Sequence, residues 1–336
     1  MKTYLEASGV PTVTVGAVEL PRLIMGIHPT DGYGYVSAAR DQAMMAYFHS
    51  TEPIVEVLSC GVAHGLTVVQ TDHMAIHRNR QQLVAIWQTM ERTDTEIRTI
   101  PFIMIPLTLD GRPLDQHRLH ATFDYNNRQA AGEEYRRYFA ADPIVQYVSS
   151  GHAAEEDMLV DSDQVAPYTP EELGGVQLDH GLLERYLGFF AGFEPFIADA
   201  GAEIDLLAPA GRFDLIDAYV KALRQRFPAV ATSIHHPGVT IPALEAGDVR
   251  FDAYITPVNK AGVFMLPTPE LTLKAVRSSR TPVIAIKPMA GGRMVRREAF
   301  DYVLNEVGVA SCMFGLGTLD EVRHTFAEAK GALTRA

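Results

Sequence analysis

Polar residues capable of acid–base chemistry follow several short apolar runs of this sequence, at the points where those runs end. Imidazole changes its charge near neutral pH, and an ammonium or carboxylate group can stabilise the charge that develops during proton transfer. If the ends of the runs meet at one place, these side chains can form a single site. They are His28, Asp31, Asp72, His73, His77, His235, His236, Asn259, Lys260 and Lys287.

The apolar runs alternate with segments of helical periodicity, and this alternation predicts how the polar residues are positioned. Repeated strand–helix units imply a parallel sheet. Eight units predict closure into a (β/α)8 TIM barrel of the α/β class, whose active site lies at the carboxyl ends of the strands. The expected strands span residues 23–27, 67–71, 102–106, 204–208, 230–234, 251–256, 283–287 and 311–315.

An open, doubly wound sheet is the alternative to the barrel. A dinucleotide-binding sheet of that kind carries a G-x-G-x-x-G fingerprint after its first strand, whereas this sequence has Gly26-Ile27-His28-Pro29. The barrel is therefore favoured. Alternation around residues 16–17 also predicts a hairpin over residues 12–20. Long helices are expected over residues 41–65 and 182–200.

Regular alternation stops between residues 107 and 179. This stretch is far longer than an ordinary loop, and it begins after the third expected strand. We therefore expect one domain, residues 1–336, with an insertion over residues 107–179 that acts as a lid or as a subunit contact in a homo-oligomer.

Composition limits the classes of partner. The chain has 336 residues, of which 47% are hydrophobic, a net charge of -12 and two cysteines. Nucleic acids and anionic membranes require clustered Lys and Arg, so an acidic chain argues against both. Two cysteines fit a reducing compartment. We expect a cytoplasmic protein that acts on a small molecule.

Side-chain parity narrows the candidates on the second and fifth strands. Adjacent residues of a strand point to opposite faces. Gln70 and Asp72 are therefore expected inside the barrel, which leaves His73 in the following loop. By the same logic only one of His235 and His236 should face the mouth.

Two lysines follow late strands. Lys287 comes after four apolar residues and before Pro288, so it is expected to project into the mouth. A desolvated lysine there can act as a base or form a Schiff base. The simpler interpretation is a cation that binds an anionic substrate or pairs with a carboxylate. Lys260, beside Asn259, has the same options.

A bound divalent metal is a further possibility. Imidazole ligands suit Zn, Fe and Ni, and His28, His73 and one of His235 and His236 could supply them. No H-x-H or H-E-x-x-H spacing supports such a site.

Glycines in the last two loops lie where many barrels bind phosphate. Thr318 and Glu321 match a capping box, which would satisfy the free amides of the last helix and place negative charge where a phosphate would bind. The candidate phosphate-binding residues are Gly291, Gly292, Arg293, Gly315 and Gly317.

Three segments carry a family resemblance. They are LPRLIMG at residues 20–26, VIAIKPMAGG at 283–292 and FGLGT at 314–318. In order and spacing they resemble the opening and the seventh and eighth strands of the aldo-keto reductases. The resemblance implies a (β/α)8 barrel and NADP-dependent hydride transfer, with an Asp and a Tyr after strand 2, a Lys after strand 3 and a His after strand 4.

The residues of this chain do not fill those four roles. Gln70 falls where the family has its Asp, and Ala75 falls where it has its Tyr. Residues 105–108 contain no Lys, and residues 207–209 contain no His. Hydride transfer to a carbonyl needs a proton donor at the developing alkoxide, which the Tyr supplies in the family.

Our first hypothesis is therefore a non-redox isomerase or lyase that acts on a small polar carbonyl or sugar-like compound. In this hypothesis His73 or one of His235 and His236 moves the proton, and Lys287 or a metal stabilises the oxyanion. One alternative is an NADP-dependent oxidoreductase with a rearranged proton donor, His73 or His77. Another is a non-catalytic, ligand-binding barrel.

Overall fold

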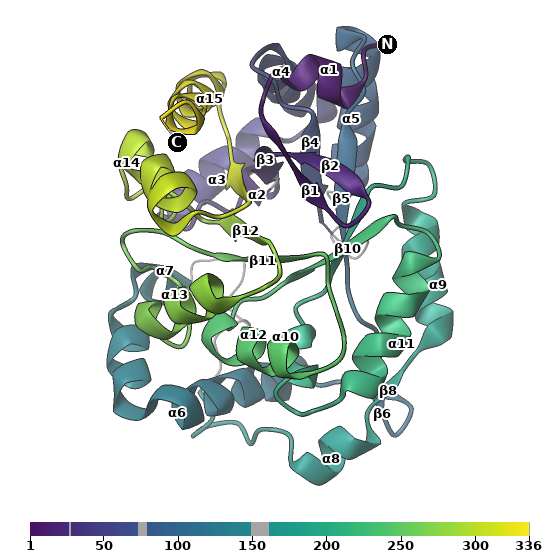
Figure 1. Ribbon diagram of the computed structural model, residues 1–336, viewed down its shortest axis with the longest axis vertical. Coiled ribbons are helices and arrows are strands. Elements are labelled where there is room, and N and C mark those ends of the chain that lie inside the picture. Colours follow the sequence, from purple (N-terminus) through teal and green to yellow (C-terminus); the bar gives the residue numbers. More distant parts are fainter. Residues whose placement is uncertain (27, 73–78, 149–160, 336) are drawn as a thin grey trace.

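The computed structural model describes residues 1–26, 28–72, 79–148 and 161–335, and its centre is a closed barrel of eight parallel strands (Figure 1). The strands follow one another around the barrel in chain order, and the last pairs with the first. Their runs are short and apolar because both faces are buried. They are β3 (Leu23–Gly26), β4 (Val68–Thr71), β5 (Arg98–Ile103), β9 (Ile197–Ala200), β10 (Ala229–Ser233), β11 (Ala253–Pro257), β12 (Val283–Ile286) and β13 (Ser311–Gly315).

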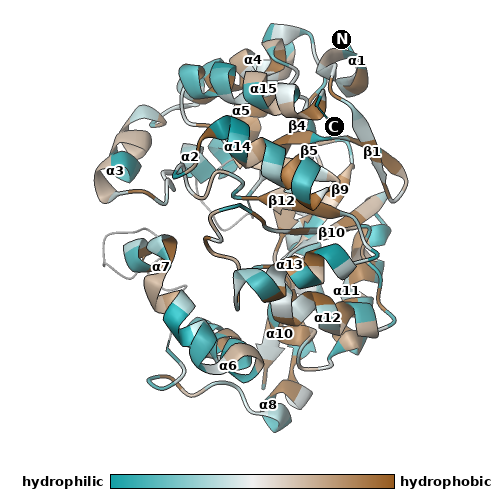
Figure 2. Cartoon of the chain, turned by 60° about the vertical axis from the view of Figure 1, so that its left-hand side comes forward, coloured by the Kyte–Doolittle hydropathy of each residue, from teal (hydrophilic) through white to brown (hydrophobic). Residues whose placement is uncertain are grey.

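Helices surround the barrel and turn their apolar faces toward it (Figure 2). After β3 come α2 (His28–Asp31), α3 (Ala38–Tyr47) and α4 (Thr51–Ala63), and after β4 comes α5 (Asn79–Thr93). The later helices are α9 (His180–Phe189), α10 (Ile204–Leu207), α11 (Phe213–Arg224), α12 (Pro237–Ala246), α13 (Pro269–Ser278), α14 (Arg296–Asp301), a π-helical turn (Tyr302–Val307) and α15 (Leu319–Leu333).

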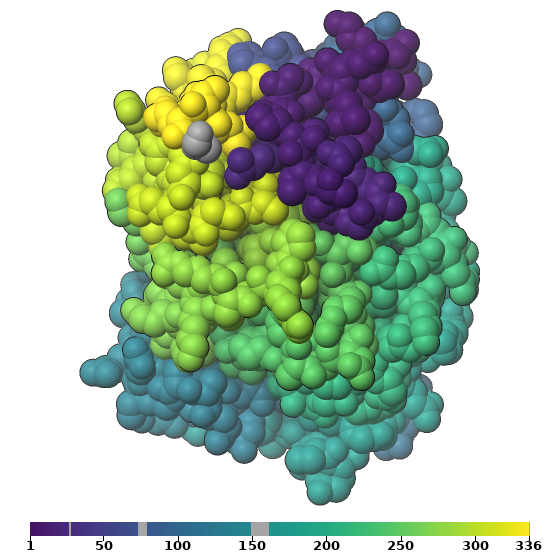
Figure 3. Space-filling view, viewed as in Figure 1, coloured from purple at the N-terminus to yellow at the C-terminus, as the bar shows by residue number. Residues whose placement is uncertain are grey.

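The N-terminal hairpin closes one end of the barrel. After the short α1 (Tyr4–Ser8), β1 (Thr12–Val15) pairs with β2 (Val18–Pro21), as expected. Val15 and Leu20 pack against Ile24, Val68 and Ile197, which lie at the beginnings of their strands. The hairpin therefore covers the amino-terminal end of the barrel, on the face that Figure 3 shows in purple. The opposite end is left for a site.

The segment between β5 and α9 contains its own secondary structure. Three short strands form a small antiparallel sheet, and α6 runs past α10 and α12 toward α7 (Figure 1). The elements are β6 (Leu107–Leu109), β7 (Arg112–Pro113), α6 (Gln116–Ala141), α7 (Pro143–Tyr147), α8 (Pro170–Gly175) and β8 (Gln177–Leu178).

The predicted fourth strand was wrong. Residues 204–208 belong to the short helix α10, and the strand is β9, inside the stretch predicted as one helix over residues 182–200. A short apolar run fits a buried strand and a buried helix equally well, so periodicity alone cannot separate them. The long helix expected over residues 41–65 is also two helices, α3 and α4, interrupted near Ser50.

Within the described ranges, none of the helices combines the length and the apolar character that crossing a bilayer requires.

Candidate functional site

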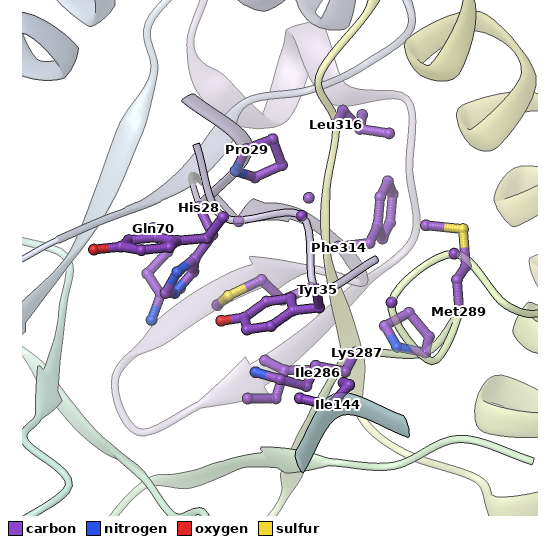
Figure 4. A pocket seen from close by; sticks show the side chains of 18 of the residues that line it. His28, Pro29, Tyr35, Gln70, Ile144, Ile286, Lys287, Met289, Phe314 and Leu316 are labelled. Atoms are coloured by element: carbon purple, nitrogen blue, oxygen red, sulfur yellow. The ribbon is translucent and has the colours of Figure 1, made fainter. Parts of the chain in front are cut away.

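A cavity of about 640 Å³ lies at the carboxyl ends of the strands. Its volume falls in the usual range for a small-molecule site. Because the strands are parallel, residues that follow different strands meet there (Figure 4). Eight of the residues predicted from the sequence line it, namely His28, Gln70, Asp72, His235, Lys287, Gly291, Gly292 and Gly315.

The floor of this cavity rests on a carboxyl group that the sequence analysis missed. Asp199, fully buried on β9, accepts hydrogen bonds from Gln70 Nε2 at 2.7 Å and from Ser233 Oγ at 2.8 Å. Burial raises the pKa of Asp199 to about 7. An acid in the otherwise apolar run Ile-Ala-Asp-Ala was the available signal, but it fell inside a stretch predicted as helix.

Two further carboxyl groups lie just beyond β9. Glu203 accepts a hydrogen bond from the Ile105 amide, and Asp205 accepts one from the His235 amide at 2.7 Å. Burial raises the pKa of both groups to about 7. They tie the loops after β5 and β10 to the fourth strand, so their contacts position the site.

The two adjacent histidines separate as parity requires. His235 lines the main cavity and also a smaller neighbouring one, whereas His236 lines only the smaller cavity. Nδ1 of His236 lies 2.7 Å from Asn127 Nδ2. Burial and the Lys287 ammonium lower the pKa of His235 well below its ordinary value. Burial lowers the pKa of His236 to about 3. Both imidazoles are therefore neutral at physiological pH.

Lys287 lies between two aromatic rings. Its Nζ is 4.6 Å from the centroid of the Tyr35 ring and 5.4 Å from that of Phe264, which are cation–π distances. Tyr35 and Phe264 also line the cavity. Neither ring was identified from the sequence, because Tyr35 follows β3 at a distance and Phe264 belongs to the loop after β11.

Short segments of the 107–179 stretch cover one side of the mouth. Ile144 and the adjacent Val148 line the cavity. Asp142 caps α7 through the Ile144 amide at 2.8 Å and also accepts the Phe264 amide at 2.6 Å. Tyr147 donates a hydrogen bond to Asp41 of α3 at 2.6 Å. These bonds connect α7 to the loop after β11 and to helix α3.

Several predicted site residues lie outside the main cavity. Asn259 is buried and holds its own loop through both the amide and the carbonyl of Val263. Lys260 is exposed and pairs with Glu298 at 2.7 Å. Arg293 donates to the Ala290 carbonyl oxygen at 3.2 Å. These side chains are committed to contacts away from the mouth, as is His236.

The loop before α15 uses its polar groups internally, as the capping pattern predicted. Thr318 caps the helix by accepting the Glu321 amide at 3.2 Å. The Glu321 carboxylate accepts the Gly317 amide at 2.8 Å and pairs with Arg40. Gly317 is thus occupied, whereas Gly315, Glu321 and Arg40 line the cavity.

The proposed metal site has no complete ligand set in the part of the chain that the structure describes. No group of three His, Cys, Asp or Glu side chains among those residues is arranged to hold an ion. His73, one of the expected ligands, lies outside the described residues, as does His77.

Comparisons with known proteins identify the fold. No protein-family profile matches the chain, and no curated protein matches its sequence. Among solved structures, a Pseudomonas aeruginosa protein assigned as an aldo-keto reductase aligns with a TM-score of 0.51 and 12% identity over 97% of this chain and 96% of its own. A second structure with the same assignment and source gives 0.52 and 13% over 96% and 95%.

These comparisons correct our first hypothesis. The similar barrels are assigned as oxidoreductases, so the findings favour the oxidoreductase alternative and give no support to an isomerase or lyase. The corrected fourth strand still provides no His, since β9 is followed by Gly201 and Ala202. Ala75 lies outside the described residues. At these identities the likeness concerns architecture, and it shows that the chain has an aldo-keto reductase-like (β/α)8 barrel fold.

Proposed function

We propose that this protein is an NADP-dependent oxidoreductase that interconverts a carbonyl and an alcohol, with a proton donor other than the family's Tyr. One observation supports this proposal above the others. In a barrel with an aldo-keto reductase-like fold, a single cavity is lined both by the polar residues at the strand ends and by the loop between β13 and α15. A dinucleotide is long enough to contact both of these regions, whereas a small sugar alone is not.

Residues of the β12–α14 segment and of the neighbouring β13–α15 end fit a dinucleotide in part. Gly292 has a left-handed φ of 86°, and a Cβ there would meet nothing within 4 Å, so its backbone is open to a ligand. Arg296 and Arg40 line the same end and can bind phosphate. Glu321 opposes them, but it is already paired with Arg40. When bound, the nicotinamide would supply the hydride.

The chain itself must supply a proton to the substrate oxygen. His28 lines the cavity, and its buried Nδ1 has no hydrogen-bond partner among the described residues. Figure 4 shows its ring beside Gln70 at the floor. A neutral imidazole N–H can stabilise an alkoxide and then protonate it. We therefore assign this role to His28. Gln70, held by its hydrogen bond to Asp199, forms the bottom of the cavity beside it.

Titration with NADPH, followed by cofactor fluorescence, tests the proposal. We expect saturable binding by the wild-type protein and a Kd raised about fivefold or more in Arg296→Ala, because one charge-assisted phosphate contact is lost. Arg297→Ala is the matched control, since Arg297 is the next residue of α14 but its side chain is 66% exposed. Absence of saturable binding of both NADPH and NADH by folded wild-type protein would exclude this function.

A further inference from the structure

We infer that the Ser233 hydroxyl donates a hydrogen bond to the carbonyl oxygen of the substrate, and that the buried carboxylic acid of Asp199 gives it this polarity by donating its own proton to Ser233. That the acceptor is the reacting carbonyl rests on the proposed function. The donor itself is argued from the contacts of Asp199 and is tested without turnover.

Ser233 lies between the cavity and a buried acid. It is the last residue of β10, points into the barrel as Ala231 does, and lines the cavity. Its Oγ is 2.8 Å from Asp199 Oδ2, the oxygen to which Gln70 Nε2 also donates at 2.7 Å. The Ser233 hydroxyl is therefore within two hydrogen-bond lengths of the Gln70 amide. Figure 4 shows the ring of His28, the assigned proton donor, beside Gln70.

The second oxygen of Asp199 indicates where the proton of the acid lies. The side chain is fully buried, and its Oδ1 has no hydrogen-bond partner among the described residues. A buried donor without a partner is less tolerable than a carbonyl oxygen without one. In the neutral acid Oδ1 is therefore the carbonyl oxygen, and the proton is on Oδ2, where Ser233 Oγ can accept it.

The protonation of Asp199 decides which way the Ser233 hydroxyl points. A serine hydroxyl has one proton to donate and two lone pairs that accept. A carboxylate can only accept, so it takes the Ser233 proton and leaves lone pairs facing the cavity. A carboxylic acid donates to Oγ instead, so the Ser233 proton is released to the cavity side. There it can bond to an oxygen that accepts, such as that of a ketone.

The surroundings of Asp199 favour the neutral acid up to about neutral pH. In the barrel, β5 places Phe102 and β10 places Ala231 beside it in register. Burial raises the pKa of Asp199 to about 7 in spite of the hydrogen bonds that it accepts, and the charge of Asp72, next to β4, acts in the same direction as burial. Ser233 therefore donates toward the cavity below this pH and accepts above it.

The cavity walls describe what accompanies the acceptor oxygen. Phe102, Ile286 and Phe314 line the same cavity as Ser233 and present apolar surface. A neutral carbonyl on an apolar or aromatic body fits this combination of one donor and apolar walls. A carboxamide oxygen of the nucleotide is the other acceptor of this chemistry. We assign Ser233 to the substrate because its neighbour Gln70 lies beside His28.

Isothermal titration with 3-hydroxyacetophenone and 3-ethylphenol compares two neutral probes that differ in one carbonyl oxygen. NADP+ is present, so no hydride is available for reduction. We expect the wild-type protein to bind the ketone about fivefold more tightly at pH 6, because one hydrogen bond is added. At pH 8 the two affinities should agree within about twofold, because ionised Asp199 then takes the Ser233 proton.

Two variants separate the donor from the acid that orients it. Ser233→Ala should lose the preference for the ketone at both pH values. Asp199→Asn should keep it at both, because the amide must place its NH2 group at the Oδ2 position, next to Ser233 Oγ. At the Oδ1 position that group would have no acceptor among the described residues. Thr232→Val is the control. It removes the adjacent hydroxyl, which donates to the Ala200 carbonyl oxygen at 3.3 Å, and should keep the preference and its pH dependence.

Other outcomes decide against the inference. Equal affinities in the wild-type protein at pH 6, or no binding of either probe at millimolar concentration, would overturn it. A Ser233→Ala protein that keeps the preference but binds NADP+ more weakly would place the acceptor oxygen on the nucleotide. A pH dependence that persists in Asp199→Asn would reject the role of the acid. The titrations are repeated without NADP+, and a ketone preference in a wild-type protein that binds no nucleotide would uphold the donor and reject the proposed function.

Discussion

Lys260 and Lys287 follow neighbouring strands of the barrel, yet they reach different surroundings. The Lys260 side chain is 43% exposed and pairs with Glu298 on the outside. The Lys287 side chain lines the cavity between Tyr35 and Phe264. The two positions looked equivalent in the sequence, because each lysine follows an apolar strand and a parallel barrel brings all strand ends together.

Backbone conformation explains the difference. Lys287 comes directly after Ile286, the last residue of β12, and its φ of 53° turns the chain at the mouth. Lys260 comes three residues after the end of β11, and Asn259 folds that loop onto Val263. The direction of a strand therefore determines at which end of the barrel the following loop begins. The first residues of that loop determine where each side chain points.

The largest expected effect concerns Asp199, the buried carboxyl group beneath the cavity. Lys260 faces a carboxylate in water, whereas Asp199 beneath the mouth has a pKa raised to about 7 by burial. A raised carboxyl pKa stabilises the fold below the unfolded value of about 4, and that stability is lost as pH rises to about 7. Asp199→Asn cannot ionise. Relative to wild type it should gain on the order of 2 to 4 kcal/mol of unfolding free energy between pH 4 and pH 8.

Urea unfolding at both pH values measures this change. Asp217→Asn, an exposed residue of α11, is the control and should follow the wild-type pH dependence. A pH-independent difference between Asp199→Asn and wild type would show that the floor carboxyl does not titrate as burial implies.

The next effect concerns Asp142, which holds the Phe264 loop beside Lys287. Asp142 is 2% exposed and accepts the amides of Ile144, Val145 and Phe264. We expect Asp142→Ala to lower the unfolding free energy by about 2 to 3 kcal/mol, since buried donors lose their partner. Asp115→Ala, which removes the cap of α6, should cost about 1 kcal/mol. Guanidinium titrations measure both losses. Equal losses of unfolding free energy in the two variants would show that the hydrogen bond to the Phe264 amide adds no stability beyond that of an ordinary helix cap.

The smallest effect compares glycine and alanine at the two lysine positions. At Lys287 the left-handed backbone favours glycine, so Lys287→Gly should be more stable than Lys287→Ala by about 1 kcal/mol. At Lys260 the order should be reversed, because the backbone there is not left-handed and glycine only adds freedom to the unfolded chain. Thermal unfolding of the four variants measures both differences, and the same sign at both positions would contradict our explanation.

Much of the fold could be predicted from the residues alone. The hairpin, the closed barrel and the places of seven of the eight strands follow from apolar runs and their alternation with helices, although β5 begins four residues before the strand expected at 102–106. The exception is β9, since its run contains Asp199 and a more apolar run follows at α10. Local periodicity cannot reveal that a buried acid accepts hydrogen bonds from Gln70 and Ser233 on other strands.

The site was predicted less completely. Parity placed Gln70, Asp72 and one of the adjacent histidines at the mouth, and His235 lines it. It could not separate Lys260 from Lys287 or find Tyr35 and Phe264, because loop conformations depend on what packs against them. The sequence by itself thus determined a barrel and the strand ends that carry polar groups, because those follow from hydrophobic pattern and pleat. Only the tertiary structure decided which of these groups share one cavity, because contacts between distant loops set the backbone angles there.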